Sequence, residues 1–224
     1  MKNTKTSRRS LLLLFGGLLV AGCSPLTAAT DTKGKGTAPS VPLLAPKGKE
    51  VATLAGGCFW SMQTLMSQLK GVEKITSGYS GGTVANPSYE AVCTGATGHA
   101  ESIQVTFDPK VISYADLLHI YFTAHDPTTL NRQGADEGTQ YRSAVFYANA
   151  QQKSAAEKVI KEINAGKLYS DPVVTEVTPY KNFYAAEGYH QNYYTKNPNE
   201  GYCQMVIAPK VVKFRKKYLQ RLKA

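Results

Sequence analysis

Residues 50–69 read EVATLAGGCFWSMQTLMSQL, and this stretch decides the fold. Its first part, Glu50–Ala55, predicts a strand, and the part from Cys58 onward places apolar residues on one face of a helix. Gly56-Gly57 joins them, so the chain turns from strand to helix at Cys58. A thiol on the first turn of a helix lies near N–H groups without intrahelical partners, which favour the thiolate. We therefore predict a reactive cysteine.

Two aromatic rings, Phe59 and Trp60, follow this cysteine and can line a dry pocket for a methyl-sized group. A helix N-terminus stabilises an adjacent anion by about 0.3–1 kcal/mol, so we expect the pKa of the Cys58 thiol to lie below its ordinary value. The alternative is a buried cysteine that acts only as a small apolar residue. The glycines before Cys58 favour the reactive interpretation, because they let a substrate approach the backbone.

The first 22 residues are typical of an export signal. Basic residues precede Leu11–Val20, an apolar run of ten residues that is too short to span a bilayer but suits a signal peptide. The residues Val20-Ala21-Gly22-Cys23 resemble the lipobox of bacterial lipoproteins, so Cys23 is expected to carry the lipid. The alternative is an ordinary cleaved signal with an incidental cysteine.

Two further features indicate the destination. Arg8-Arg9 is a feature of twin-arginine export, and Ser24 resembles the residue that follows the cysteine in outer-membrane lipoproteins. We therefore expect a lipid-anchored protein on the periplasmic face of the cell envelope. Subtracting the four cations of residues 1–22 from the formal net charge of +10 leaves +6 for the rest. Since an exported protein seldom meets nucleic acid, this charge indicates a solvated basic surface.

The remaining chain divides into a tether and one domain. Residues 23–49 are rich in Thr, Ala, Gly, Pro and Lys, and they predict a flexible tether. Residues 50–224 have the length of one domain with its own core. Cys58, Cys93 and Cys203 are an odd number for a disulfide scaffold, so at least one thiol should be free.

Strands and helices are mixed along this domain. The pattern predicts an α+β fold, a two-layer sandwich of ferredoxin-like derivation with a mixed, mostly antiparallel sheet flanked by helices. Strands are expected over 50–55, 72–79, 101–107, 142–147 and 172–177, and helices over 58–69, 113–123, 149–165 and 211–222, with one helical turn at 89–93.

Several polar residues could serve the cysteine. Glu101 begins a strand, and in an apolar pocket it would have a raised pKa and could donate a proton, although such a residue is often solvated. His99 and His190 are expected to be structural or supporting. Tyr89 and Tyr141 are open between a pocket role and the edge of the core.

Cys203 follows the run 197–201, which is rich in Asn, Pro and Gly, so it is expected to be mobile enough to approach Cys58.

Four ordered motifs together resemble the A-type peptide-methionine (S)-sulfoxide reductases, over about residues 50–215. They are Gly57-Cys58-Phe59-Trp60, Val92-Cys93-Thr94-Gly95 with Gly98-His99-Ala100-Glu101, Asn131-Arg132-Gln133-Gly134 with Gly138-Thr139-Gln140-Tyr141-Arg142-Ser143, and Tyr189-His190-Gln191 with Tyr193, extended by Asn197-Pro198, Gly201-Tyr202-Cys203 and Ile207-Ala208-Pro209-Lys210.

The resemblance implies a role for each matching residue. Cys58 resembles the nucleophile, Glu101 the acid that protonates the sulfoxide oxygen, and Cys203 the resolving cysteine. Phe59 and Trp60 resemble the walls of the methyl pocket. The residues that resemble partners of the oxygen are Tyr89, Asp136 and Tyr141.

The resemblance also implies substrates and partners. They are oxidised proteins, free methionine sulfoxide and a thioredoxin-type reductant, with no metal or other cofactor and a monomeric protein. No cysteine follows Cys203, so one resolving step is expected, and Cys93 matches a position without a redox role. Ala135 departs from the asparagine that is common before Asp136, which affects a loop hydrogen bond rather than the chemistry.

Two other functions stay open. A thiol hydrolase would pair Cys58 with His99 or His190 and need no reductant. A non-enzymatic lipoprotein could bind a ligand or metal through cysteines and histidines, although no C-x-x-C or H-x-x-x-H spacing supports a metal site.

Overall fold

The structure, a computed structural model, describes residues 43–224. The predicted signal peptide, Cys23 and most of the predicted tether lie outside the described residues. Within the described part, no helix has both the length and the apolar character needed to cross a membrane.

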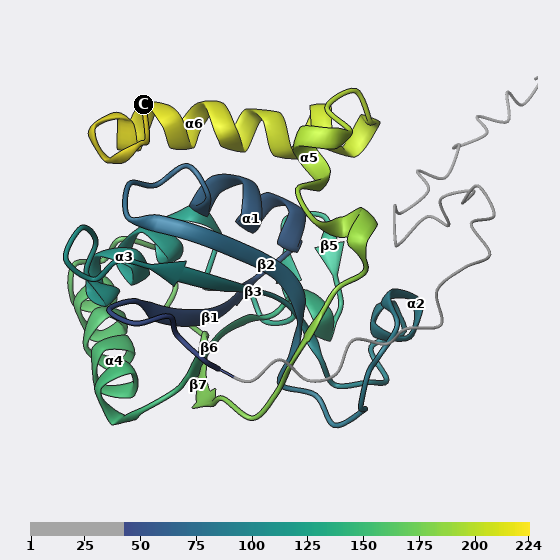
Figure 1. Cartoon of the computed structure of the whole chain (residues 1–224), viewed down its shortest axis with the longest axis horizontal. Helices are drawn as coiled ribbons and strands as arrows, with labels where there is room; N and C mark the ends of the chain where they lie inside the picture. The colour runs from purple at the N-terminus through teal and green to yellow at the C-terminus, as the bar shows by residue number, and fades with distance from the viewer. Residues whose placement is uncertain (1–42) are drawn as a thin grey trace, which may run out of the picture.

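A six-stranded sheet forms one layer of the domain, in the order β7-β6-β1-β3-β2-β8 (Figure 1). All neighbouring strands are antiparallel except β6 and β7, which are parallel. The sheet is therefore mixed and mostly antiparallel, which confirms the predicted fold class. The strands are β1 (Glu50–Gly56), β2 (Val72–Ser80), β3 (Ala100–Phe107), β6 (Ser143–Tyr147), β7 (Glu176–Pro179) and β8 (Phe183–Ala185).

The helices form the second layer. In Figure 1, α1 lies between the sheet and α6, and α3 and α4 lie toward the opposite end of the sheet from α2. The longer helices are α1 (Phe59–Met66), α3 (Tyr114–Ala124), α4 (Ala150–Ala165) and α6 (Ala208–Tyr218). The short elements are α2 (Tyr89–Cys93), α5 (Tyr193–Lys196), a strand pair of β4 (Arg132–Gln133) and β5 (Asp136–Glu137), 3₁₀ turns at Thr139–Tyr141, Gly188–His190 and Leu219–Arg221, and a π-helix at Cys203–Ile207.

Alternation along β3 decides which side chains face the helices. Ile103, Val105 and Phe107 are fully buried in the core cluster that also contains Met62 of α1. Glu101 stands two residues before Ile103, and alternate residues of a strand point to the same face. The strand therefore directs the Glu101 carboxyl toward the layer that contains α1.

Local caps fix where two helices begin, as predicted. The Ser113 hydroxyl accepts a hydrogen bond from the Asp116 N–H at 3.0 Å, and the Asn149 side chain accepts one from the Gln152 N–H at 2.9 Å. Each cap satisfies an N–H group that has no partner within its helix, a contribution of about 1 kcal/mol.

Some predicted bounds are wrong. The strand predicted over 172–177 lies at Glu176–Pro179, because its parallel register pairs Ala144 with Glu176 and Tyr147 with Pro179. The C-terminal helix spans Ala208–Tyr218 rather than 211–222. After α6 the chain forms a bridge between Leu222 and Leu69, with the Lys223 N–H donating to the Gln68 carbonyl at 2.8 Å.

Candidate active site

The turn from β1 into α1 places Cys58 at the N-cap of α1, as the sequence predicts. Gly57 has a φ of +79°, and a Cβ at this position would lie 2.4 Å from Cγ of Gln133. Only glycine fits there without displacing that side chain. The Cys58 carbonyl accepts hydrogen bonds from the N–H groups of Ser61 and Met62, at 3.1 and 3.2 Å. These bonds fix the backbone of Cys58 at the start of the helix.

Glu101 lies beside this cysteine. Its side chain is 2% exposed, and its Oε2 accepts a hydrogen bond from the Phe59 N–H at 3.0 Å. Phe59 directly follows Cys58, so the carboxyl group occupies the N-terminus of α1 next to the sulfur. The structure therefore places the side chains of Cys58 and Glu101 close together at the start of α1.

The Cys58 thiol does not have the lowered pKa that its helix position predicts. Burial, and then the charges of Glu101 and Asp136, raise the pKa of the thiol well above its ordinary value, although a hydrogen bond with Tyr202 acts in the opposite direction. A helix N-terminus contributes only about 1 kcal/mol. That contribution cannot offset the burial of a thiolate beside two carboxyl groups, so Cys58 is a neutral thiol at rest.

Aromatic rings surround the two residues after Cys58. Trp60 stacks on Tyr193 with 3.7 Å between ring centroids, and its indole N–H donates to Nδ1 of His190 at 3.0 Å. Burial lowers the pKa of His190 to about 3, so the ring is neutral and can accept this bond. Phe59 also packs on His190, with centroids 5.0 Å apart. The rings give the site an apolar wall of fixed shape.

Tyr202 is a site residue that the sequence reasoning did not single out. Its hydroxyl donates to Oδ2 of Asp136 at 2.7 Å and also forms a hydrogen bond with Cys58. It therefore joins the predicted oxygen-side residue Asp136 to the predicted nucleophile. Burial raises the pKa of Asp136, while the Tyr202 bond and the charge of Lys210 act to lower it. The one signal for Tyr202 in the sequence is its place next to Cys203.

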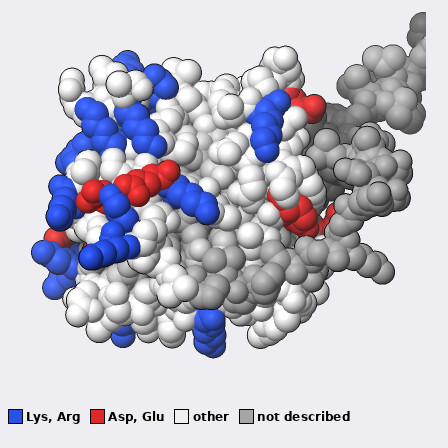
Figure 2. All heavy atoms as spheres, in the orientation of Figure 1, with Lys and Arg blue, Asp and Glu red and all other residues white. Residues whose placement is uncertain are grey.

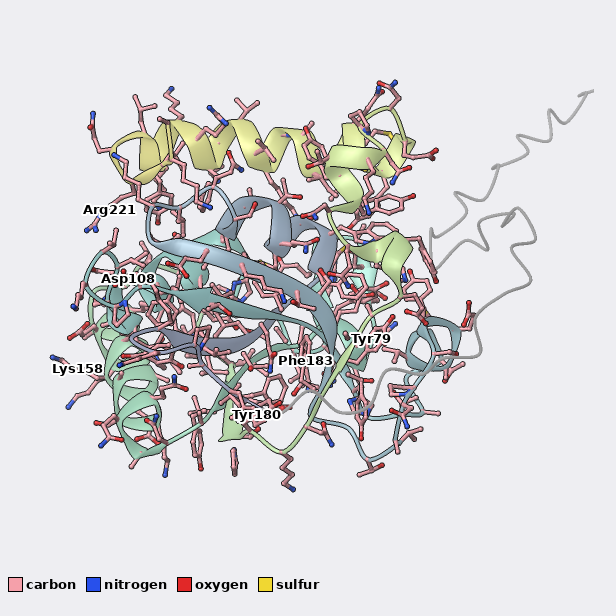
Figure 3. The ribbon with its side chains drawn as sticks, viewed as in Figure 1. Tyr79, Asp108, Lys158, Tyr180, Phe183 and Arg221 are labelled. Atoms are coloured by element: carbon pink, nitrogen blue, oxygen red, sulfur yellow. The ribbon has the colours of Figure 1, made fainter. Side chains whose placement is uncertain are left out.

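Of the two predicted tyrosines, Tyr89 packs against the aromatic rings beside the site, and Tyr141 is buried in the core. The Tyr89 ring packs on His190 with centroids 4.4 Å apart, and the Tyr89 N–H donates to Oε1 of Glu187 at 3.0 Å. Glu187 Oε2 in turn accepts a hydrogen bond of 2.8 Å from the hydroxyl of Tyr79. Tyr79 is the β2 residue labelled in Figure 3. Tyr141 is buried in the same apolar cluster as Cys58. Glu187 and Tyr79 are further supporting residues that the sequence did not reveal.

Cys203 is fully buried at the start of the π-helix, not in a mobile loop. Helical bonding already extends to this segment, since the Gln204 N–H donates to the Glu200 carbonyl at 3.0 Å. Cys203 and Ile207 pack in the core, which holds the segment in a helix. Cys58 and Cys203 are both free thiols, and both lie within electrostatic reach of the Tyr193 hydroxyl.

The histidines do not form a cysteine–histidine pair. His99 uses both ring nitrogens on the loop after β2: Nδ1 accepts from the Gly82 N–H at 3.1 Å, which leaves Nε2–H to donate to the Val84 carbonyl at 2.7 Å. His190 accepts from Trp60 instead. The geometry therefore gives the hydrolase alternative no histidine base. Across residues 43–224, no group of His, Cys, Asp and Glu side chains is arranged to hold a metal ion.

The fold and site define a thiol-based enzyme, in which a buried cysteine and a carboxyl group lie side by side next to packed aromatic rings. The family profile "Peptide methionine sulfoxide reductase" matches residues 50–223. The peptide methionine sulfoxide reductase MsrA of Deinococcus radiodurans is 50% identical over 193 residues, which cover 86% of this chain and 91% of that protein. The MsrA of Polynucleobacter asymbioticus is 53% identical, over 75% of this chain and 89% of that protein.

Solved structures agree with this result. The reduced form of Mxr1 from Saccharomyces cerevisiae has a TM-score of 0.66 and 37% identity, and the match covers 70% of this chain and 91% of that one. Methionine sulfoxide reductase A of Corynebacterium diphtheriae has a TM-score of 0.64 and 34% identity, over 72% and 82% of the two chains. This chain therefore belongs to the peptide methionine sulfoxide reductase family, as the four sequence motifs implied.

Proposed function

We propose that this enzyme reduces the S epimer of methionine sulfoxide to methionine, both in proteins and as the free amino acid. The observation that carries the proposal is the 3.0 Å hydrogen bond from the Phe59 N–H to Glu101. It holds a carboxyl group beside the sulfur of Cys58, so that one sulfoxide group can meet both. A sulfoxide oxygen leaves only when it is protonated, and the pair supplies the nucleophile and the acid together.

Proton transfer within this pair produces the reactive state. A neutral thiol with an ionised carboxylate holds the same single proton as a thiolate with a neutral carboxylic acid. The two groups therefore titrate together, and the reactive arrangement needs no net uptake of a proton. Cys58 then attacks the substrate sulfur while Glu101 protonates the oxygen. The oxygen passes to Cys58, which becomes a sulfenic acid, and methionine is released.

The surrounding residues select and hold the sulfoxide. Phe59 and Trp60 receive the methyl group in their apolar pocket. Tyr89, Asp136 and Tyr141 are the partners around the oxygen, directly or through water, and the two tyrosine hydroxyls act as preorganised donors to it.

Cys203 closes the cycle. Its thiol condenses with the sulfenic acid of Cys58, releasing water and forming a disulfide. Cys203 is buried at the start of the π-helix, and we propose that this turn opens when the two sulfurs bond. A thioredoxin-type dithiol then reduces the disulfide by thiol–disulfide exchange and is itself oxidised.

The N-terminal sequence supports a location for this repair. Residues 1–22 act as a lipoprotein signal, Cys23 carries the lipid, and the tether over 23–49 connects it to a monomeric catalytic domain at the cell envelope, on the periplasmic face of the outer membrane. There the enzyme repairs oxidised envelope proteins. The mass of the mature N-terminus tests this part: an unmodified Met1 or a cleaved, unlipidated Cys23 would contradict it.

Two cysteine variants test the chemistry. Cys58→Ser should abolish reduction of methionine sulfoxide with either dithiothreitol or thioredoxin. Cys203→Ala should still give one methionine per enzyme in a single turnover but should lose cycling with thioredoxin. Cys93→Ser is the matched control and should keep both activities.

The proposal fails if Cys58→Ser stays active, or if Cys203→Ala cycles with thioredoxin at the wild-type rate. Reduction of the R epimer in place of the S epimer would overturn the assigned stereochemistry.

A further inference from the structure

A hollow of about 410 Å³ lies between α6, the end of α3 and the loop before β4, apart from the residues that hold the sulfoxide. Its floor is apolar, with Leu65, Phe214 and Tyr218 in the lining. The hydroxyls of Thr123 and Tyr218 form a hydrogen bond, which ties α3 to α6 across it. This volume falls in the range of sites that take a side chain or small ligand.

Three lysines of α6 line the hollow without a salt bridge to an acidic side chain among residues 43–224. Lys210, Lys213 and Lys217 form no ion pair within residues 43–224, whereas Lys153, for example, pairs with Glu157 at 3.6 Å. The only acidic residue in the lining is Asp126, and its Oδ1 accepts bonds from the N–H and hydroxyl of Thr128. The hollow therefore carries an excess of positive charge above an apolar floor.

The wider surface has the same sign. Residues 210–224 contain seven Lys and Arg residues and no acid. Figure 2 shows Lys and Arg side chains gathered over this end of the molecule, at the upper left of the view. A field of this kind attracts anionic groups toward the hollow.

The hollow adjoins the catalytic residues at one end. Lys210 lies within electrostatic reach of Asp136, whose pKa it lowers. Gln133 lines the hollow and also packs against Gly57, the residue before Cys58. From Lys210 to Lys217 the helix advances by about 10 Å, so the lysines lead away from the reacting sulfur over the length of a few extended residues.

We propose that this hollow binds acidic side chains that flank the oxidised methionine in a polypeptide substrate. The inference rests on the proposed function and adds a substrate preference to it. A carboxylate on a short apolar stem matches both the ammonium groups, which form no salt bridge within residues 43–224, and the apolar lining. A concave site of this volume fits a side chain better than a flat lipid surface.

The test uses the full chain and two peptides that differ only around one S-methionine sulfoxide, with Asp and Glu in one and Asn and Gln in the other. At low ionic strength, kcat/KM should be about threefold to tenfold higher for the acidic peptide, because exposed pairs contribute modestly. The preference should shrink as salt is added. Lys213→Gln/Lys217→Gln should remove it and leave reduction of free methionine sulfoxide unchanged.

The matched control is Lys158→Gln/Lys181→Gln, which removes the same charge elsewhere; Figure 3 shows Lys158 pointing outward from α4. This control should keep the preference. Equal kcat/KM for the two peptides in the wild type, or a preference that survives Lys213→Gln/Lys217→Gln, would overturn the inference. Loss of binding to phosphatidylglycerol vesicles in that variant, with no peptide preference in the wild type, would identify a lipid site instead. No reduction of free methionine sulfoxide by the wild type would overturn the proposed function, not this inference.

Discussion

The chemistry of Cys58 is decided by neighbours that oppose its ionisation. Burial, Glu101 and Asp136 raise the pKa of the thiol, and Tyr202 partly compensates. Because thiolates are the species that oxidants and alkylating agents attack, a neutral thiol is protected at rest. In our mechanism the sulfur becomes reactive when its proton has moved to the carboxyl group, with a sulfoxide in the pocket.

The first prediction concerns Glu101→Gln. This change removes the proposed acid, so the rate of methionine sulfoxide reduction should fall by about 10²–10⁴-fold. It also removes a negative charge beside Cys58, so the pKa of the thiol should fall. Activity assays and the pH dependence of iodoacetamide alkylation measure the two effects.

Glu176→Gln is the control, since Glu176 pairs with Arg142 rather than with the site. A loss of activity under threefold in Glu101→Gln would assign the proton to another group. An unchanged alkylation profile would mean that the carboxyl does not influence the sulfur.

Tyr202→Phe should act on the same thiol in the opposite direction. It removes the hydroxyl that can turn from Asp136 and donate to the sulfur when the thiolate forms, so the pKa of Cys58 should rise and alkylation near neutral pH should slow by about tenfold or more. Tyr180→Phe, which removes a hydroxyl bonded to Gln104, is the control. Faster alkylation of Tyr202→Phe would show that the ring acts chiefly as a cover over the sulfur.

At the scale of elements, the β1–α1 turn determines where the sulfur lies. Gly57→Ala should destabilise the protein, because the new Cβ would meet Gln133 at 2.4 Å in a backbone conformation that alanine rarely adopts. Gly48→Ala is the control, since Gly48 also has a positive φ, +76°, but nothing lies within 4 Å of its Cβ position.

Because Gly57 and Gly48 both have a positive φ, the difference in stability between the two variants measures the clash with Gln133 and not the backbone strain. Gly57→Ala should cost about 1–3 kcal/mol more than Gly48→Ala in the free energy of unfolding, measured with urea. Equal costs in the two variants would show that Gln133 moves aside freely.

Elements with local signals could be predicted from the sequence. Ser113 and Asn149 cap their helices through the third residue along, a contact that a short window of sequence contains. In contrast, β8 has three residues and exists because it pairs with β2 about a hundred residues earlier. Its pattern alone carries no comparable signal, which explains why it was missed.

The distinction between local signals and long-range contacts also applies to the residues of the candidate site. Cys58 and Glu101 were predicted from motifs, and the structure brings them together. Tyr202 was missed because its partner Asp136 is 66 residues away. The pKa of Cys58 was predicted in the wrong direction because the helix position is local, whereas burial and the two carboxyl groups depend on the tertiary fold.

At the scale of the whole molecule, the buried His125 makes the free energy of unfolding depend on pH. His125 Nδ1–H donates to the Tyr121 carbonyl at 2.8 Å, and its Nε2 accepts from the Ser143 hydroxyl at 2.7 Å. Burial lowers the pKa of His125 from 6.5 to about 4. Between these values the unfolded chain binds a proton that the folded protein excludes, so the contribution of His125 to stability is fully present above pH 6.5 and is lost as the pH falls toward 4.

This coupling gives a prediction for acid unfolding. The difference of about 2.5 pH units corresponds to about 3 kcal/mol of unfolding free energy lost from His125. Urea unfolding at about pH 7 and about pH 4.5 measures it, and His125→Gln should flatten the dependence by most of that amount. A His125→Gln profile parallel to the wild type would show that other titrating groups, such as His190, cause the acid sensitivity.

The bridge that fastens the end of the chain restricts how Cys203 can travel. Lys70 N–H donates to the Arg221 carbonyl and Lys223 N–H to the Gln68 carbonyl, both at 2.8 Å, so the far end of α6 is anchored to the loop after α1. Phe214 fastens the middle of the helix in the core. A swinging C-terminal arm is thereby disfavoured, and the excursion that delivers the second sulfur falls to the few residues between α5 and Ile207. Disulfide formation then requires a conformational change only in the residues before α6, while α6 itself keeps its position.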